Sequence, residues 1–253
     1  MKYGLNLYSV RNLIKTEEDF LSTAEKLRDM GYSYLQYSGA PLIADRIKRV
    51  SEATGLPICL THSPMDRILG DTEALMDEHE VFGCKRIGLG MLPRTTISDP
   101  ELFYPAIEAL SEAAEKMAKR GFSFFYHHHH YEFLKLDGVT ALDYMIKNAP
   151  KINFTLDTYW IQYGGGDVLE YIEKLKGRIA CVHLKDYAIR IKEDGDFAPD
   201  FAPVGDGTMN FPTIVDKMKA SGTEFFLVEQ DNAPNFPDTL AEVKRSIDYL
   251  KGI

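Results

Sequence analysis

The feature that most constrains this chain is the regular alternation of two kinds of segment along its whole length. Short runs rich in β-branched and aromatic residues have the length and composition of buried strands. Between them lie longer stretches with apolar residues at helical spacing, such as Phe20, Ala24 and Leu27. The expected strands cover residues 3–8, 33–37, 57–62, 85–90, 122–128, 152–157, 179–184 and 224–229.

The helical stretches also carry start and stop signals. Thr16, with Asp19 three residues later, predicts a helix N-cap, as does Asp71 before a second helical stretch. A glycine follows most helical stretches, where a left-handed cap is needed that glycine adopts without steric cost. These glycines are Gly31, Gly55, Gly83, Gly121, Gly177 and Gly222.

Eight strand–helix units without a linker or composition break predict an α/β fold, a (β/α)8 TIM barrel that forms a single domain over residues 1–253. A doubly wound open sheet is the alternative, but it would need fewer strands or a second domain. In a barrel, catalytic groups lie at the C-terminal ends of the strands and in the loops that follow them.

Composition excludes several classes of protein. The chain has no run of 18 apolar residues and its start lacks the apolar core of a signal peptide, so we expect no membrane association. Its cysteines are few and odd in number (Cys59, Cys84 and Cys181), which indicates a reducing, cytoplasmic location. A formal net charge of -9 argues against binding to nucleic acid, which depends on lysine and arginine.

Four expected strands end in residues that bind metals or transfer protons. The strand at 122–128 runs into HHHHYEF, and the three last strands run into LDTYW, HLKD and VEQD. A single acidic residue at a strand end is more often a cap or a surface charge. Four such ends together predict a site, because alternation along each strand places Asp157, His183 and Glu229 on the inward face.

The same alternation gives two candidates from the histidine run, since His127 and His129 share one face of their strand. Two imidazoles and two carboxylates form a mixed nitrogen and oxygen site. Such a site suits one divalent ion, with Mn²⁺, Co²⁺ or Zn²⁺ favoured over Mg²⁺.

These residues resemble the sugar phosphate isomerase/epimerase group, the xylose isomerase-like TIM barrels that also include endonuclease IV. The resemblance covers almost the whole chain and rests on LNLYSVR at 5–11, YHHHHYEF at 126–133, LDTYWIQYGGGDV at 156–168, GRIACVHLKDY at 177–187, PVGDGTMNF at 203–211 and VEQD at 228–231. It implies a metal-dependent enzyme of carbohydrate metabolism, with His127, Asp157, His183 and Glu229 as the metal ligands.

One residue departs from the group's pattern. Its epimerases usually have a glutamate where this chain has His127, so that two metal-bound glutamates flank the substrate. An imidazole bound through one nitrogen keeps only an N–H and no lone pair for a base. Glu229 is then the only base on the metal. This favours one-base isomerisation through an enediolate, or elimination or hydration of a keto-sugar, with Lys185 or His129 as the acid.

Four further residues are candidates for substrate binding. Arg11 follows the first strand and would bind an anionic group, while His62 follows the third strand. Trp160 would stack on a sugar face. Glu132 would bind substrate hydroxyls or orient a histidine. The glycines of Gly205–Gly207 are only weak evidence for a phosphate site.

The predicted function is therefore a divalent-metal-dependent isomerase or epimerase of a small-molecule sugar. The alternatives are a lyase or hydratase of a keto-sugar or inosose, and a DNA-repair nuclease of the endonuclease IV kind. The nuclease is disfavoured because it needs more metal ligands and a basic face. A non-enzymatic sugar- or metal-binding subunit is a further alternative. The sequence leaves the sugar, its phosphorylation and homo-oligomerisation open.

Overall fold

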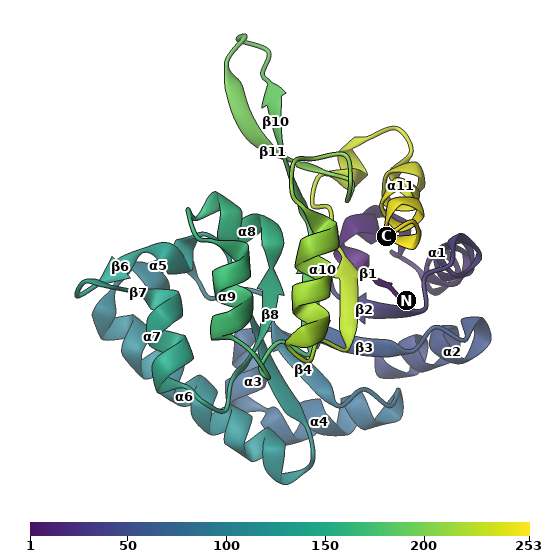
Figure 1. The fold of residues 1–253 in the computed structure, drawn as a ribbon. Coiled ribbons are helices and arrows are strands. Elements are labelled where there is room, and N and C mark those ends of the chain that lie inside the picture. Colours follow the sequence, from purple (N-terminus) through teal and green to yellow (C-terminus); the bar gives the residue numbers. More distant parts are fainter.

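The computed structural model describes all residues from 1 to 253. Eight parallel strands close into a barrel in the order β1-β12-β9-β8-β5-β4-β3-β2, which confirms the predicted (β/α)8 fold (Figure 1). The barrel strands are β1 (Gly4–Asn6), β2 (Tyr34–Tyr37), β3 (Ile58–His62), β4 (Arg86–Leu89), β5 (Ser123–His127), β8 (Asn153–Asp157), β9 (Cys181–Leu184) and β12 (Phe225–Val228).

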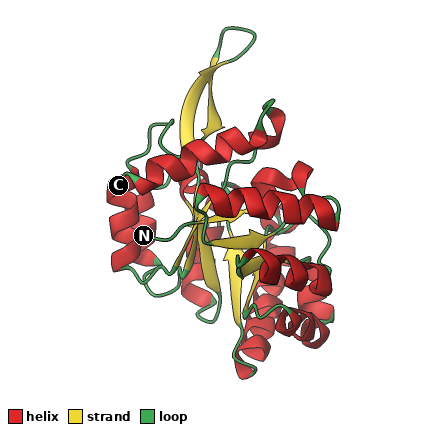
Figure 2. Ribbon diagram, turned by 90° about the vertical axis from the view of Figure 1, so that its right-hand side faces the viewer, coloured by secondary structure: helices red, strands yellow, loops and turns green.

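Helices surround the barrel on its outside (Figure 2). The longest, α6 (Pro100–Lys119), is capped by Asp99, whose side chain accepts a hydrogen bond from the backbone N–H of Glu101. The helices are α1 (Glu17–Met30), α2 (Ala44–Thr54), α3 (Met65–Gly70), α4 (Thr72–Val81), α5 (Arg94–Ser98), α6 (Pro100–Lys119), α7 (Ala141–Asn148), α8 (Thr158–Tyr163), α9 (Val168–Lys174), α10 (Phe211–Ala220) and α11 (Thr239–Lys251).

Side chains along the barrel strands point alternately into two apolar clusters. Outward-facing residues such as Ile87, Phe154 and Val182 join the large core between barrel and helices. A smaller cluster fills the barrel interior and includes Phe125, Cys181 and Leu227. Because successive side chains point to opposite faces, the residues two positions later along these strands lie above this cluster, at the C-terminal rim.

All eight predicted strands are confirmed within a few residues at their ends. The six glycines predicted to end helices all have positive φ, between 70° and 99°. Thr16 and Asp19 form the predicted capping box of α1. Asp71 directly precedes α4 as predicted, but its side chain makes no capping hydrogen bond. It pairs instead with Arg67 at 3.3 Å.

Two short hairpins interrupt the simple alternation. Strands β10 (Asp186–Ile191) and β11 (Phe197–Ala202) form an antiparallel hairpin that projects from the barrel directly after β9 (Figure 1). Strands β6 (Lys135–Leu136) and β7 (Val139–Thr140) form a smaller one after β5. The apolar residues Ile189, Ile191 and Phe197 are exposed on the larger hairpin.

No helix of the structure has both the length and the apolar composition needed to cross a membrane.

His79 on α4 makes the stability of the fold sensitive to acid. Its ring is fully buried: Nδ1 donates to the carbonyl of Leu75, and Nε2 accepts from the hydroxyl of Thr61, both at 2.7 Å. Burial lowers the pKa of His79 to about 4. The neutral ring therefore stabilises the folded state above the ordinary histidine pKa, and this contribution is lost as the pH falls toward 4.

The free energy of unfolding of the unmodified protein should fall between pH 7 and pH 5. We expect this fall to be about 2 kcal/mol smaller in His79→Gln, because the variant has no imidazole at this position to protonate on unfolding. Urea unfolding of both proteins at the two pH values measures this difference. Carboxylates titrate in both proteins, so they cancel in the comparison. An identical pH dependence of the two proteins would contradict the prediction.

Candidate active site

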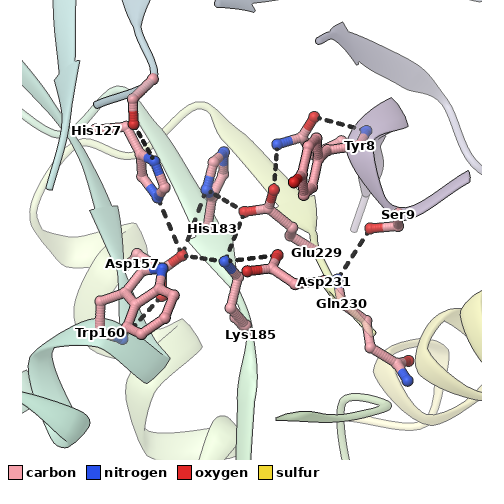
Figure 3. A network of polar contacts seen from close by, with 12 residues as sticks. Tyr8, Ser9, His127, Asp157, Trp160, His183, Lys185, Glu229, Gln230 and Asp231 are labelled. Atoms are coloured by element: carbon pink, nitrogen blue, oxygen red, sulfur yellow. Dashed lines mark hydrogen bonds and ion pairs between the residues drawn. The ribbon is translucent and has the colours of Figure 1, made fainter. Parts of the chain in front are cut away.

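The four strand ends predicted to supply metal ligands meet at the C-terminal rim of the barrel (Figure 3). His127 ends β5, Asp157 ends β8, His183 lies on β9 and Glu229 follows β12. One potential ligand atom from each of these residues lies within 4.8 Å of the others, and all four side chains are buried. We call these four residues the tetrad.

The hydrogen bonds of His127 determine which ring nitrogen is free. Nδ1 lies 2.9 Å from the carbonyl oxygen of Gly90. A carbonyl only accepts, so Nδ1 carries the hydrogen and the neutral ring has its lone pair on Nε2. This Nε2 lies 3.2 Å from Oδ2 of Asp157, which is also an acceptor.

His183 shows the same arrangement. Its Nε2 donates to Oε1 of Gln36 at 2.7 Å, so the lone pair of the neutral ring is on Nδ1. Nδ1 lies 2.7 Å from Oε2 of Glu229 and 3.5 Å from Oδ2 of Asp157. Neither Nδ1 nor Oε2 of Glu229 has an aligned hydrogen-bond partner. Burial alone would lower the pKa of His183, but the Glu229 and Asp157 carboxylates raise it to about 9.

A metal ligand must be a neutral imidazole, and in that form both rings direct a lone pair at a carboxylate oxygen. Acceptors that face each other in a buried site repel, unless a proton or a metal ion lies between them; without an ion, the raised pKa of His183 keeps a proton in that place. The donor set of two imidazole nitrogens and two carboxylates could therefore hold a divalent metal ion.

The two carboxylates of the tetrad are held by neighbouring groups. Oδ1 of Asp157 accepts from the backbone N–H of Trp160 at 3.0 Å, and the backbone N–H of Asp157 donates to Nε2 of His128 at 3.1 Å. Oε1 of Glu229 accepts from the side-chain amide of Asn6 at 2.7 Å. The remaining oxygens, Oδ2 of Asp157 and Oε2 of Glu229, face the two imidazoles.

Lys185 places an ammonium group among the buried carboxylates. Its Nζ lies 3.1 Å from Asp157, 3.0 Å from Glu229 and 3.0 Å from Asp231 (Figure 3). Burial alone would lower the pKa of Lys185, but these three carboxylates raise it well above its ordinary value, so the group stays charged. Burial alone would also raise the pKa values of Asp157 and Glu229, whereas Lys185 and the histidines lower them well below the ordinary range.

A pocket of about 600 Å³ opens above the tetrad. Its walls include His62, His129 and Trp160, as well as Lys185 and Asp231. Polar atoms of the first three (Nε2, Nδ1 and Nε1, respectively) are buried without a partner. Burial, followed by the proximity of other cationic groups, lowers the pKa values of both His62 and His129 well below their ordinary value, so both rings are neutral.

Two predicted substrate-binding residues do not line this pocket. Glu132 is fully buried: its carboxylate accepts from the Tyr126 hydroxyl at 2.5 Å and from the backbone N–H of His129 at 2.8 Å. Of the two roles expected for Glu132, contact with substrate hydroxyls does not fit these bonds, whereas a role in orienting a histidine agrees with its hydrogen bond to the backbone of His129. Arg11 donates to the carbonyls of Tyr8 and Asp231 at 2.8 Å and 3.1 Å, so it links two loops at the rim instead of facing the cavity.

The weak phosphate signal at Gly205–Gly207 also has another explanation. The backbone N–H groups of Gly205 and Gly207 donate to the carboxylate of Asp186, at 2.8 Å and 2.9 Å. These donors already have an anionic partner within the chain, and they anchor the base of the β10–β11 hairpin.

Sequence reasoning missed the residues that orient the tetrad. Asn6 and Gln36 are fully buried amides on β1 and β2. Their signal was a polar amide inside an apolar strand, which needs a hydrogen-bond partner when buried. His128 points away from the barrel interior as expected, but it contacts the backbone of Asp157. Arg94, which was not predicted, lines the pocket in place of the predicted Arg11.

Comparison with known proteins agrees with the barrel fold. The model of the family described as xylose isomerase-like TIM barrel matches residues 24–253. No curated protein matches the sequence.

Solved structures share the fold over almost the full chain. A sugar phosphate isomerase/epimerase from Parabacteroides distasonis ATCC 8503 has a TM-score of 0.80 and 27% sequence identity, covering 100% of this chain and 98% of that one. L-ribulose 3-epimerase has a TM-score of 0.72 and 16% identity, covering 99% and 94%. A probable 3-DHS dehydratase from Bacillus anthracis has a TM-score of 0.71 and 14% identity, covering 99% of each chain.

The position of Lys185 generates a prediction about the metal-free protein. We expect Lys185→Met to lower the free energy of unfolding by about 3–5 kcal/mol after treatment with a chelator, because buried carboxylates lose their cation. Urea or thermal unfolding of the chelated proteins measures the effect.

Lys174→Met is the matched control. Lys174 pairs with Asp143 at 3.2 Å and Glu170 at 2.8 Å on the exposed surface, where such pairs contribute about 1 kcal/mol or less. Equal stability of the two variants would show that Lys185 does not balance the buried carboxylates.

Proposed function

The chain belongs to the xylose isomerase-like TIM barrel family, and from this premise we propose that it is a divalent-metal-dependent isomerase or epimerase of a small keto or hydroxy sugar. The observation that carries the proposal is the orientation of the tetrad. Two imidazole lone pairs and two carboxylate oxygens converge beneath a pocket whose walls hold unpartnered polar atoms.

The proposed ligands of a single ion are His127, Asp157, His183 and Glu229. When bound, the ion would act as a Lewis acid that stabilises the negative charge of an enediolate. The support for His127 over His129 is that Nε2 of His127 faces Asp157 at 3.2 Å, and that His127, not His129, belongs to the group whose ligand atoms lie within 4.8 Å of one another.

A polyhydroxylated substrate matches the pocket wall. Buried polar atoms without partners cost free energy in the empty protein, so they mark places where a ligand completes the hydrogen bonds. The indole N–H of Trp160 is a donor, and the neutral rings of His62 and His129 each offer one unpartnered nitrogen to a hydroxyl group. Trp160 also presents an aromatic face of the kind that packs against sugar C–H groups.

Glu229 is the proposed base. His127 donates its Nδ1–H to Gly90 and directs its only lone pair at Asp157, so it has no free nitrogen for a substrate proton. One carboxylate would take a proton from a carbon and return it to the neighbouring carbon, which is the one-base route of an isomerase.

Lys185 and His129 support this chemistry in different ways. The raised pKa of Lys185 keeps its ammonium charged, so it stabilises negative charge on an enediolate oxygen better than it releases a proton. His129 lies beside His127, with 4.6 Å between ring centroids, and is the remaining candidate for proton transfer at an oxygen.

A lyase or dehydratase of a keto-sugar is the second candidate. The specific observation that favours it is the single base, because removal of a proton from carbon is also the first half of an elimination. The nuclease alternative has less support: the tetrad has only four ligands and the net charge is -9.

We expect purified protein loaded with Mn²⁺, Co²⁺ or Zn²⁺ to retain one ion per chain after desalting. His183→Ala should reduce this content sharply because it removes a nitrogen ligand. Elemental analysis measures both. His130→Ala is the control, since His130 lies outside the tetrad against Trp160 and Tyr163. Failure to retain any of the three ions would refute the metal assignment.

We expect Glu229→Gln to retain metal but lose turnover by about 10² to 10⁴-fold, the usual contribution of a general base. Deuterium incorporation from D₂O into a panel of ketopentoses and ketohexoses, followed by NMR, detects proton removal whichever product forms.

Glu224→Gln, at the other end of the same strand, is the matched control and should leave turnover unchanged. If Glu229→Gln keeps nearly full exchange while His127 variants lose it yet retain metal, the assignment of the base is wrong. His127 would then be the base, and His129 would supply the fourth ligand.

A further inference from the structure

The geometry points to Arg94 as the residue that binds an anionic group of the substrate, a phosphate or a carboxylate at the end remote from the tetrad. This inference rests on the proposed function and deepens it, since it concerns the substrate class of the same pocket.

The guanidinium of Arg94 is fixed in direction but not neutralised. It stacks on the ring of Tyr131 with 4.8 Å to the ring centroid, and Nη2 donates to the Tyr131 hydroxyl at 3.1 Å. No carboxylate lies within ion-pair distance of Arg94, unlike the arginines that pair with acids elsewhere in the chain, such as Arg49 and Arg120. Its other N–H donors form the planar fork that suits phosphate or carboxylate oxygens.

A continuous aromatic wall connects Arg94 to the tetrad. Tyr131 stacks on His129 with 5.3 Å between centroids, and His129 contacts His127 at 4.6 Å and Trp160 at 5.0 Å. These five residues all line the same pocket. One ligand can therefore reach both the tetrad and Arg94.

The charges of the pocket favour an anionic ligand. Asp157, Glu229 and Asp231 carry three negative charges, which the Lys185 ammonium and a divalent ion would balance. Arg94, which is exposed at the mouth of the pocket, adds a positive charge that water solvates and no carboxylate pairs with, and an anionic substrate group would pair with it.

The other two cations near the cavity are less suited to an anionic ligand. Lys185 contacts three carboxylates, and Arg11 donates through Nη1 to two backbone carbonyls at the rim and does not line the pocket. Arg94 is thus the cation of the pocket wall with free donors.

Three ketoses with one carbon skeleton test the proposal: D-fructose, D-fructose 6-phosphate and D-fructuronate. Isothermal titration of each into Mn²⁺-loaded protein compares a neutral, a phosphorylated and a carboxylated end group. We expect at least one charged ligand to bind about 10- to 100-fold more tightly than D-fructose, the contribution of a charge-assisted hydrogen-bond pair. A preference for the phosphate or for the carboxylate identifies the source of the anion.

Arg94→Gln should remove this preference while leaving D-fructose affinity and metal content unchanged. Arg190→Gln is the matched control, because Arg190 is exposed on the β10–β11 hairpin and does not line the pocket. The proposal is overturned if neutral and charged ketoses bind equally, if the preference persists in Arg94→Gln, or if neither charged ketose binds.

Failure of this inference is distinguishable from failure of the proposed function. Deuterium exchange into neutral sugars without any anion preference would refute the role of Arg94 and leave the isomerase proposal intact. Arg94-dependent binding of charged ketoses without exchange or turnover would support the role of Arg94 and refute the isomerase proposal.

Discussion

In His127 and His183, one ring nitrogen donates to an oxygen that can only accept, the carbonyl of Gly90 and the amide oxygen of Gln36. The other nitrogen of each ring is then turned toward a carboxylate of Asp157 or Glu229. For a neutral ring this contact is repulsive in a site shielded from water, so the pair needs a proton or a metal ion between its atoms. Three further features fit a site that holds a positive charge between these atoms: the Lys185 ammonium, the burial of the tetrad and the open pocket above it.

The directions of the tetrad side chains are set partly by residues on strands that supply no tetrad residue. Asn6 on β1 holds the carboxylate of Glu229, which follows the neighbouring strand β12, and Gln36 on β2 holds the imidazole of His183 on β9, three strands away. His128 supports Asp157 from outside the barrel wall. Such outer contacts fix the tautomer and direction of each ligand, and their loss typically weakens metal binding about 10- to 100-fold.

Much of the fold could be predicted because each barrel strand has its own local signal, and glycine ends most of the helices. Asp157, His183 and Glu229 were predicted together because strands of a parallel barrel end at one rim and side chains alternate along each strand. The partners of Asn6 and Gln36 were not, since these contacts form only when β1 and β2 close against the last strands.

The loops were harder to predict for the same reason. Arg11 and Arg94 both follow strand ends, and only the path of each loop decides which guanidinium faces the pocket. The β10–β11 hairpin lies where no helical or strand periodicity was recognised, and Asp186 at its base had no visible partner before the backbone of Gly205 and Gly207 folded over it.

The hydrogen bond between Asn6 and Glu229 joins residues 223 positions apart in the chain. The amides that orient the tetrad are therefore synthesised before any residue of the tetrad, and Glu229 is the last of the four to be made. Until β12 emerges and pairs with β1, the growing chain has neither a closed barrel nor the complete tetrad. The site thus forms only after β12 has joined the barrel, so a partly synthesised barrel does not present the complete tetrad.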